Sequence, residues 1–580
     1  MKLLDSRRLT GINIVSDAPG AVIDVAFEDA QAQPIIAAWQ EQARAVLDAV
    51  GWSDEGTHVR RFDGGASLQI TAPIDGWYAA CEINEWAWQA AEAVLSGGGA
   101  TPLTALEEGG GATPLIPLAE AVGSLRVLVE AESNPRLMVL RAAAQARGVT
   151  LLSDDELVSV GLGSGSLSWP VDELPDPDAV DWEQVHDIPV VLITGTNGKT
   201  TTSRLLAHMV TASGATAGNT SSDGVQVGGE IVLPGDYTGG EGARALLWDQ
   251  RVDYAILETA RGGLLRRGLP VAHAQAALVT NVGRDHLGEF GVADLDELAD
   301  TKMLVTRAVE ADGSVVLNAD DQALVERSRG LVAPVTWIAR SRLSPGIKEH
   351  IDAGGQAFYV RDCSLVRSCA GNFEEILGVE EIPITLGGAA RHNVYNALGA
   401  VALAYALGLD RDSISRGLRA MRGTPEDNPG RGNLFEVDGV RVFVDFAHNP
   451  SGVQAVVEMA TRLEAQRRLI VLGQAGDRDD KSIRALARAA WVAGIDHVIV
   501  KEMPKYLRGR ELGEVTALIA DELRLAGAPE EAIEVVDSEL EAITRALEWA
   551  RPGDLLLLLL QEREEGLAYL REVSTSGWNE

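Results

Sequence analysis

The stretch GTNGKTTT contains residue types that could bind the phosphates of a nucleotide. It follows a strand-like apolar run and precedes a helix-length amphipathic run, so its backbone N–H groups and the helix N-terminus would point at an anion, with Lys199 adding a full charge. The usual phosphate loop reads G-x-x-x-x-G-K-[ST], whereas Ile193 occupies the first glycine position here and only Gly195 and Gly198 remain. We still expect Lys199 on the β- and γ-phosphates and Thr200 on Mg²⁺. The less favoured alternative is a glycine-rich turn with a surface lysine.

Polar side chains that could complete this chemistry follow two later strand-like runs. Glu258 ends one run in LETARGGLLRRG, and Asp285 and His286 follow the next in TNVGRDHLGEFG. Ligands of α/β sheets gather at the carboxyl ends of the strands, so these side chains are candidates for ligand contacts. Each candidate has an ordinary alternative: a solvated carboxylate for Glu258, a cap or exposed loop residue for His286, and a helix-surface lysine for Lys302 in LADTKMLVTRAV.

The elements that must position these residues alternate between strand and helix. The strand-length apolar runs of the central zone are 190–194, 254–259, 276–281 and 314–318. Helix-length periodic stretches separate them, which predicts a mostly parallel sheet with helices on both faces. The zone closes with the strongly helical run Arg391–Leu409 and a Pro/Gly-rich stretch, MRGTPEDNPGRG, that is typical of a hinge.

The last part of the chain repeats this alternation on a smaller scale. Its strand-length runs are 442–446, 469–473, 497–501 and 554–560. We therefore expect a second, smaller α/β domain. Before the central zone, the acidic and proline-bearing stretch Val171–Asp187 is typical of a linker. The expected domains are residues 1–187, 188–427 and 428–580.

The composition argues against several classes of function. With 50 Lys and Arg against 85 Asp and Glu, the net charge is −35, which disfavours a nucleic-acid or anionic-membrane partner because phosphate backbones bind basic surfaces. Cys81, Cys363 and Cys369 form no CxxC pair, so neither a disulfide framework nor a cysteine-built zinc site is expected. The chain begins without an apolar signal core, and the leucine run 555–560 is too short to span a bilayer. We expect a cytoplasmic protein.

Taken in order, these motifs resemble those of the Mur ligase family, the ATP-dependent amino-acid ligases of peptidoglycan and folate-polyglutamate synthesis. The resemblance is carried by Gly195–Thr202, Glu258, Asn281–His286, Lys302, Asn393, Asn396, Arg431, DFAHNP at 445–450 and GDRDDKS at 476–482. An ordered set across two domains is far more specific than a GKT loop alone. It implies an α/β fold of three domains: an α+β N-terminal domain, a P-loop-type central domain with a mostly parallel sheet, and a Rossmann-like C-terminal domain.

Within that family the sequence is most similar to the ligase part of the cyanophycin synthetases. NTSSDGVQVGG at 219–229 and KEMPKYLRGRELGE at 501–514 carry this likeness, and residues 1–95 weakly resemble the N-terminal domain. Those enzymes also contain an ATP-grasp domain that adds Asp to a polymer backbone, while their Mur-like part joins Arg to the Asp side chains. Here fewer than 190 residues precede the loop strand, so we expect no ATP-grasp domain and no production of cyanophycin itself. The repeated GGGATPL at 97–103 and 109–115 is expected to be a flexible surface loop.

The resemblance implies a specific reaction and its residues. A carboxylate attacks the γ-phosphate of ATP, and an amine then displaces phosphate from the acyl phosphate. Thr200 and Glu258 would bind one Mg²⁺ and His286 a second, with Lys302 carbamylated near the second ion. The implied catalytic residues are Lys199, Glu258, His286 and Lys302. The implied nucleotide-binding residues are Gly195, Thr196, Asn197, Gly198, Lys199, Thr200, Thr201, Asn393, Asn396, Arg431 and Asp445.

Substrate capture is implied mainly for the C-terminal domain. The cationic residues of KEMPKYLRGR are Lys501, Lys505, Arg508 and Arg510. Together they could hold the carboxylate of an amino acid or of an acceptor, although a solvated basic loop is an equally favoured alternative. His448 and Asn449 lie just past a strand end, where nucleotide and acceptor would meet, and Arg261 is a further substrate candidate.

Three hypotheses about function remain open at this point. The leading one is a ligase that adds an amino acid or another amine to a carboxylate-bearing acceptor. A poly-γ-glutamyl or peptidoglycan-type ligase would instead use a glutamyl or UDP-linked acceptor. A degenerate subunit would keep the fold and bind a polymer or peptide without catalysis, although Lys199, Thr200 and Lys302 are all present. The sequence predicts neither the acceptor, nor the amine, nor whether the protein forms a homo-oligomer.

Overall fold

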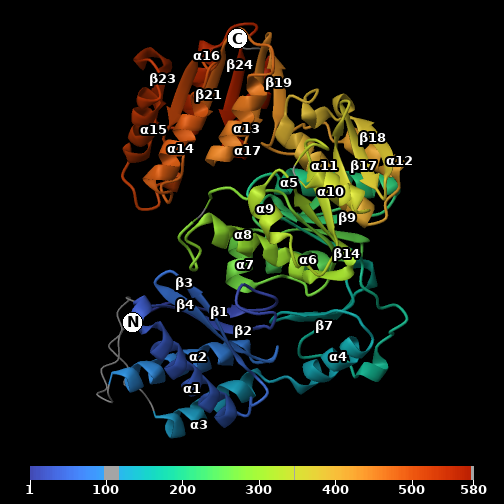
Figure 1. Cartoon of the computed structure of the whole chain (residues 1–580), viewed down its shortest axis with the longest axis vertical. Helices are drawn as coiled ribbons and strands as arrows, with labels where there is room; N and C mark the ends of the chain where they lie inside the picture. The colour runs from blue at the N-terminus through green and yellow to red at the C-terminus, as the bar shows by residue number, and fades with distance from the viewer. Residues whose placement is uncertain (97–116, 286, 345, 577–580) are drawn as a thin grey trace.

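The computed structural model describes residues 1–96, 117–285, 287–344 and 346–576. Within these residues the strands form sheets of eleven, six, four and three strands. Figure 1 shows an elongated molecule in which the N-terminal, central and C-terminal parts follow one another along the long axis. The α/β fold with a mostly parallel central sheet that the sequence predicts is confirmed.

The eleven-stranded central sheet carries the predicted phosphate loop. Its strands are β8 (Val190–Thr194), β9 (Ala217–Ser221), β10 (Gly224–Val227), β11 (Glu230–Pro234), β12 (Tyr254–Glu258), β13 (Ala274–Val279), β14 (Val309–Asn318), β15 (Val335–Ala339), β16 (Gln356–Arg361), β17 (Ser364–Cys369) and β18 (Asn372–Gly378). Strand β8 lies in the interior of the sheet, parallel to its neighbours β12 and β13. The carboxyl ends of these three strands therefore meet at one edge of the sheet. At this edge the phosphate loop follows β8, Glu258 ends β12, and the segment with Asn281 follows β13.

Helices cover both faces of this sheet, which is why its parallel strands are apolar at nearly every position. One face is covered by α5 (Lys199–Ser213), α11 (Arg391–Ala406) and α12 (Arg411–Ala420). The other face is covered by α6 (Gly240–Leu247), α7 (Arg261–Arg267) and α8 (Leu295–Met303). Two short helices, α9 (Gln322–Arg327) and α10 (Ile347–Asp352), follow later strands.

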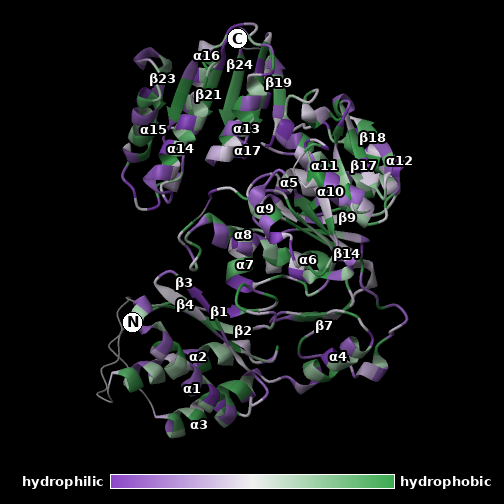
Figure 2. Ribbon diagram, viewed as in Figure 1, coloured by the Kyte–Doolittle hydropathy of each residue, from purple (hydrophilic) through white to green (hydrophobic). Residues whose placement is uncertain are grey.

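The C-terminal part is a six-stranded sheet with its own helices. Its elements are β19 (Asn433–Val437), β20 (Val440–Asp445), α13 (Pro450–Ala460), β21 (Arg468–Leu472), α14 (Asp480–Ala490), β22 (His497–Lys501), α15 (Glu514–Leu525), β23 (Ile533–Val536), α16 (Glu539–Trp549), β24 (Leu555–Leu559) and α17 (Arg563–Ser576). The strand order is β19-β20-β24-β21-β22-β23, with only β19 antiparallel. In Figure 2, β21 and β24 are hydrophobic along their length, whereas α14 and α15 also carry hydrophilic segments.

The N-terminal part combines two antiparallel sheets with helices. The first contains β1 (Lys2–Leu9), β2 (Gly20–Ala26), β3 (Thr57–Phe62) and β4 (Gly65–Thr71), packed against α1 (Ala32–Val50), α2 (Trp77–Leu95) and α3 (Leu118–Glu132). The second contains β5 (Leu151–Ser153), β6 (Leu157–Val160) and β7 (Leu167–Pro170), next to α4 (Pro135–Ala146). The buried Trp39 donates through Nε1 to Asn84 Oδ1 at 2.9 Å, so the indole N–H of this core is satisfied.

The first N-terminal sheet packs against helix α7 of the central part. Arg7 Nε donates to Leu265 O at 2.9 Å, and Thr10 N donates to Arg267 O at 2.8 Å. Arg60 Nη2 on β3 donates to Gly291 O at 3.0 Å. These bonds bring strand β1 beside the segment that follows Glu258, close to the carboxyl edge of the central sheet.

The secondary structure agrees closely with the pattern of the sequence. All eight predicted strands are present, as β8, β12, β13, β14, β20, β21, β22 and β24. The predicted linker 171–187 contains a single short 3₁₀ turn, Pro177–Ala179. The repeated GGGATPL at 97–103 and 109–115 lies outside the described residues. None of the helices in the described ranges is long and apolar enough to cross a membrane.

Candidate active site

A large cavity lies at the carboxyl edge of the central sheet. Its volume is about 1140 Å³, and residues from all three parts of the chain line it. Lys199 and Glu258 come from the central part, His448 from the C-terminal part and Arg8 from strand β1. The cavity therefore joins the predicted phosphate loop to surfaces that are far away in the sequence.

The loop at the centre of this cavity has the backbone conformation that its glycines permit. Gly198, the residue before helix α5, has φ 87°, and Gly195 has φ 146°. A Cβ atom on Gly195 would lie 1.8 Å from Thr280 Oγ1, so a larger residue would not fit. Asn281 holds the loop from the next strand, because its backbone O accepts from Thr196 N at 2.9 Å and its Oδ1 accepts from Asn197 N at 3.0 Å.

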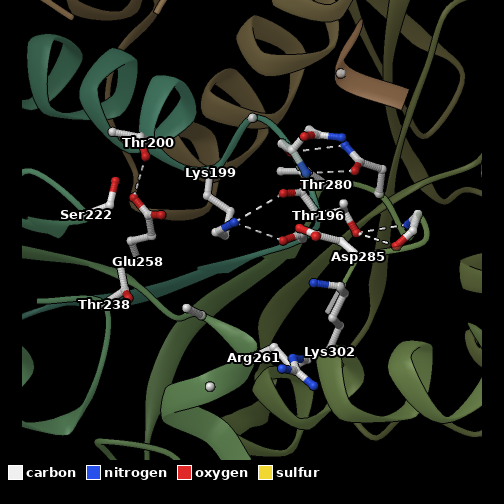
Figure 3. Close-up of a pocket in the computed structure, with 18 of the residues that line it drawn as sticks. Thr196, Lys199, Thr200, Ser222, Thr238, Glu258, Arg261, Thr280, Asp285 and Lys302 are labelled. Carbon is white, nitrogen blue, oxygen red and sulfur yellow. Dashed lines mark hydrogen bonds between the residues drawn. The ribbon is translucent and has the colours of Figure 1, made fainter. Parts of the chain in front are cut away.

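Lys199 is folded back over the loop. Its Nζ donates to Gly195 O at 3.1 Å and to Thr196 O at 3.3 Å, as Figure 3 shows. The ammonium group and the amides at the start of α5 thus lie on the same side of the cavity. This is the arrangement that binds the phosphates of a nucleotide.

Thr200 and Glu258 form a buried oxygen pair beside the lysine. Thr200 Oγ1 donates to Glu258 Oε2 at 2.8 Å, and Thr220 Oγ1 accepts from Glu258 N at 3.1 Å. Burial raises the pKa of Glu258, and the nearby positive charge of Lys199 opposes that shift. A hydroxyl and a carboxylate oxygen next to a phosphate site are the donors that Mg²⁺ takes, so these two residues fit the expected metal.

Lys302 lines the same cavity from helix α8, and Figure 3 shows it next to Asp285 and Arg261. Its side chain is buried, and burial, reinforced by the positive charge of Lys199, lowers the pKa of Lys302 to about 7. An amine with that pKa is largely neutral at slightly alkaline pH, unlike an ordinary surface lysine.

His286 lies outside the described residues, so the expected second Mg²⁺ site remains a prediction. Over the ranges that the structure covers, no group of three or more His, Cys, Asp or Glu side chains is arranged to hold a metal ion. Asp285, the residue before His286, is close to two basic side chains of the C-terminal part, at 3.6 Å from His448 Nε2 and 3.3 Å from Arg478 Nη2.

The expected nucleotide residues of the hinge and C-terminal part also line the cavity. They are Asn393, Asn396, Arg431 and Asp445, next to His392, Tyr395 and Phe446. Asn396 Nδ2 donates to Asn393 Oδ1 at 3.0 Å, and Arg431 lies over the ring of Phe446 at 5.1 Å. Burial raises the pKa of Asp445. An aromatic ring, amides and a carboxylate together suit the adenosine end of a nucleotide.

Contacts between the central and C-terminal parts hold the cavity closed on one side. Asn197 Nδ2 donates to Ser451 Oγ at 2.9 Å, and Asn449 Nδ2 donates to Asn197 Oδ1 at 3.0 Å. Asn449 Oδ1 also accepts from Gly452 N at 2.9 Å, which caps helix α13. Asn449 therefore positions the loop from across the domain boundary, whereas His448, as expected, faces the cavity.

The predicted cationic cluster of KEMPKYLRGR does not form. Of its four members only Arg508 lines the cavity, where it pairs with Asp477. Lys501 is fully buried and pairs with Glu539, because it ends a strand whose side chain turns into the domain core. The other two residues are held elsewhere by ion pairs, Lys505 with Glu562 and Arg510 with Asp480 and Glu514.

Other residues at the cavity were not singled out from the sequence. Ser222, which lies in the NTSSDGVQVGG motif directly before Asp223, lines the cavity, and Arg8 comes from the first strand of the chain. Asp223 bridges two parts of the chain, since it pairs with Arg204 at 2.8 Å and with Arg563 at 2.6 Å. Motif order could have pointed to Asp223, but no local signal connects Arg8 to the phosphate loop.

Comparison with known families defines the class of the protein. Residues 193–404 match the Mur ligase middle domain, and residues 430–559 match the Mur ligase glutamate ligase domain. The two matches together span more than half of the chain. Through these two domains the chain belongs to the Mur ligase family.

The chain is similar to relatives of two kinds within that family. The cyanophycin synthetase of Trichormus variabilis is 37% identical over 380 residues, which are 65% of this chain and 42% of that relative. The UDP-N-acetylmuramoyl-L-alanyl-D-glutamate–2,6-diaminopimelate ligase of Geobacter metallireducens is 29% identical over 430 residues, 67% of this chain and 80% of that relative. Among solved structures, E. coli FolC in complex with DHPP and ADP has a TM-score of 0.49 at 17% identity, covering 76% of this chain and 93% of that chain.

Proposed function

We propose that this protein is an ATP-dependent carboxylate–amine ligase. It joins an amino acid or another amine to a carboxylate-bearing acceptor through an acyl phosphate, and it releases ADP and phosphate. The observation that carries the proposal is the meeting of Lys199, the Thr200–Glu258 pair and buried Lys302 in one cavity, which residues of the C-terminal domain close. Membership in the Mur ligase family supports it.

The chain's own groups account for the first step of this reaction. Phosphoryl transfer requires mainly positioning and neutralisation of charge. Lys199 and the amides at the start of α5 hold the β- and γ-phosphates, and Arg431 adds a second positive charge from the C-terminal side. Mg²⁺, when bound by Thr200 and Glu258, would supply further charge neutralisation at the phosphates.

Lys302 is proposed to be carbamylated. Its neutral amine, available because its pKa is about 7, would attack CO₂ and lose a proton, which converts a lysine into an anionic oxygen ligand. The product would stand in the cavity near Asp285 and Arg261. Such an anion suits a second Mg²⁺ near the acceptor carboxylate, a site to which His286 would contribute.

The second step requires an amine delivered in neutral form while water is excluded. Arg508 and His448 line the C-terminal wall of the cavity, and Arg508 is suited to hold the carboxylate of an incoming amino acid. The contacts of Asn197 with Asn449 and Ser451 keep this wall against the phosphate loop. Closure of this kind protects an acyl phosphate from hydrolysis.

Two alternative functions concern the same site. A poly-γ-glutamyl or peptidoglycan-type ligase is supported by the match of residues 430–559 to the glutamate ligase domain. A degenerate binding subunit is disfavoured by the intact Lys199, Thr200 and Glu258. We place the reaction in the cytoplasm, where ATP is available.

Phosphate release with a panel of amino acids and carboxylate acceptors tests the proposal. We expect release only when ATP, an amine and an acceptor are all present, and its loss in Lys199→Ala. Lys348→Ala, which changes an exposed lysine, is the matched control and should behave like the wild type. Full ligation by Lys199→Ala would refute the proposal, and ordinary ATP binding without turnover of any pair would favour the binding subunit.

A further inference from the structure

The part of the cavity that β1, α6 and α7 line is rich in arginine. Four arginines line it: Arg8 on β1, Arg244 on α6, and Arg266 and Arg267 on α7. We call this region the arginine end. It brings together the N-terminal sheet and two helices of the central part, because β1 packs against α7.

The arginine end carries positive charge that the described residues do not neutralise. In contrast to Arg261, which pairs with Glu289, these four side chains form no ion pair with any residue in the described ranges. Two carboxylates, Asp236 and Glu241, also line this end, and Asp236 Oδ1 accepts from Thr238 Oγ1 at 2.7 Å. Four arginines against two carboxylates give this region a net positive charge, in a chain whose net charge is −35.

Two further observations show that the arginine side chains of this region lack partners and repel one another. Arg244 Nε is buried and has no hydrogen-bond partner among the described residues. Burial lowers the pKa of Arg267, and the positive charges of Arg8 and Arg244 lower it further. A buried N–H donor without a partner and three mutually repelling guanidinium groups both destabilise the free protein, and an anion would relieve both.

Three of the four side chains, those of Arg8, Arg266 and Arg267, are nevertheless held in place. The guanidinium of Arg8 lies 3.7 Å from the centre of the Tyr78 ring, and that of Arg266 lies 6.0 Å from the centre of the Phe290 ring. Arg267 Nη1 donates to Arg266 O at 3.2 Å. Cation–π and backbone contacts orient a guanidinium without neutralising it, so its charge stays available to a ligand.

We propose that the arginine end binds anionic groups that the acceptor carries in addition to the carboxylate that is activated. The acceptor is then a polyanion, with carboxylate or phosphate groups that arginine can bind through two parallel hydrogen bonds. This inference rests on the proposed ligase function and narrows its substrate class. It also gives the N-terminal domain a role, since Arg8 makes it part of the acceptor site.

Helix α7 sets an approximate spacing for these groups. Arg261 lies at its start beside the catalytic lysines, and Arg266 follows five residues later, which is about 8 Å along a helix axis. In an extended peptide this distance corresponds to about two residues. An acceptor peptide with anionic side chains near its reacting end would therefore reach the arginine end, whereas one with cationic side chains would be repelled.

Binding of defined probes to the full chain tests this inference by calorimetry. The nucleotide site is first saturated with Mg²⁺ and the non-hydrolysable analogue AMPPNP. The probes are tri-aspartate, uridine diphosphate and the monoanion N-acetylalanine. We expect at least one of the two polyanions to bind at least tenfold more tightly than N-acetylalanine, and the one that does identifies carboxylate or phosphate as the anionic group.

Substitutions of these arginines test whether the polyanion binds at the arginine end. The double variant Arg8→Gln/Arg267→Gln and the single variant Arg244→Gln should each weaken polyanion binding at least tenfold. Arg329→Gln removes an exposed arginine outside the cavity and should have no effect. Thermal unfolding of each variant checks that it is folded, and Arg244→Gln gives a second reading if the double variant is unstable.

Two results would overturn the inference: equal affinity of the wild type for all three probes, or unchanged polyanion affinity in folded variants at both positions. Because no turnover is measured, this outcome is separate from that of the proposed function. A protein that binds polyanions at the arginine end but never ligates them would contradict the ligase proposal alone.

Discussion

Thr200 Oγ1 donates a 2.8 Å hydrogen bond to Glu258 Oε2, which ties the first turn of α5 to the end of β12. The two residues are 3% and 4% exposed and lie 58 positions apart in the chain. Strand β8, which leads into the phosphate loop, pairs in parallel with β12 and places Ile193 opposite Glu258, so the loop, the hydroxyl and the carboxylate lie at the same edge of the sheet. Their chemistry depends on the oxygen atoms, which single substitutions can remove.

Glu258→Gln should lower kcat at least about 100-fold, because it removes the negative charge that would hold Mg²⁺ at the phosphates. The amide can still accept the hydrogen bond of Thr200, so the melting temperature should change little. Steady-state phosphate release measures the effect, with Glu349→Gln, at an exposed position of helix α10, as the control. A folded Glu258→Gln variant with wild-type kcat would show that this carboxylate has no part in the reaction.

Activity should depend on dissolved CO₂ through Lys302. Since its pKa is about 7, the neutral amine that reacts with CO₂ becomes more abundant as the pH rises from 6 to 8, and activity should rise with it. Protein labelled with ¹³C-bicarbonate should show a carbamate ¹³C resonance that is missing in Lys302→Arg. Activity in CO₂-depleted buffer should fall several-fold and return when bicarbonate is added.

The same group also affects stability. The folded protein releases the Lys302 proton near pH 7, while the unfolded side chain keeps it to about its ordinary value of 10.5, so the contribution of an unmodified Lys302 to stability rises with pH between these values. A bare Lys302 amine in density from crystals grown with bicarbonate would contradict carbamylation.

Asp223 should be a determinant of stability across the domain boundary. Burial alone would raise the pKa of Asp223, but the guanidinium groups around it, of Arg431, Arg563 and Arg204, together hold it below its usual range. Its stabilising effect is therefore complete at neutral pH and is lost as the pH falls below about 4. Asp223→Asn leaves the buried Arg204 uncompensated, which we expect to cost about 3 kcal/mol of unfolding free energy at pH 7.

Chemical denaturation at pH 7 and at acid pH measures this cost. Asp54→Asn, on the exposed surface, should not change the unfolding midpoint. If Asp223→Asn unfolds at the same denaturant concentration as the wild type at pH 7, the arginines do not depend on this carboxylate.

Arg508 and Lys501 should separate substrate capture from folding. Arg508→Gln removes the charge that faces the cavity, so we expect the KM for the incoming amino acid to rise about tenfold with little change in melting temperature. Lys501→Met leaves Glu539 buried without its cation, so the melting temperature should fall while the KM stays the same. If Lys501→Met instead raised the KM and left the melting temperature unchanged, Lys501 would belong to the substrate site.

The phosphate loop and the elements next to it could be predicted because residues that are neighbours in the sequence form them. The strand before Gly195, the loop and helix α5 follow from one contiguous stretch, and the alternation of apolar runs indicates a parallel sheet around them. Glu258 and Lys302 were expected at the cavity from motif order and are found there.

Features that depend on distant contacts were not predictable. Lys501 was expected in a cationic cluster that binds substrate, but its partner Glu539 lies 38 residues further along, and only the folded domain brings the two together. Arg8 reaches the cavity because the N-terminal sheet packs against α7. Its neighbour Arg7 bonds there to Leu265, which lies 258 residues further along the chain. No periodicity or motif in the sequence records such a contact.

Isotope transfer tests the central claim most directly. An acceptor from the active panel is prepared with ¹⁸O in its carboxylate and incubated with ATP, Mg²⁺, the amine and the enzyme, and the released phosphate is examined by mass spectrometry. An acyl phosphate intermediate predicts one ¹⁸O atom in each phosphate, together with ADP. Unlabelled phosphate, or ¹⁸O in AMP with release of pyrophosphate, would contradict the account.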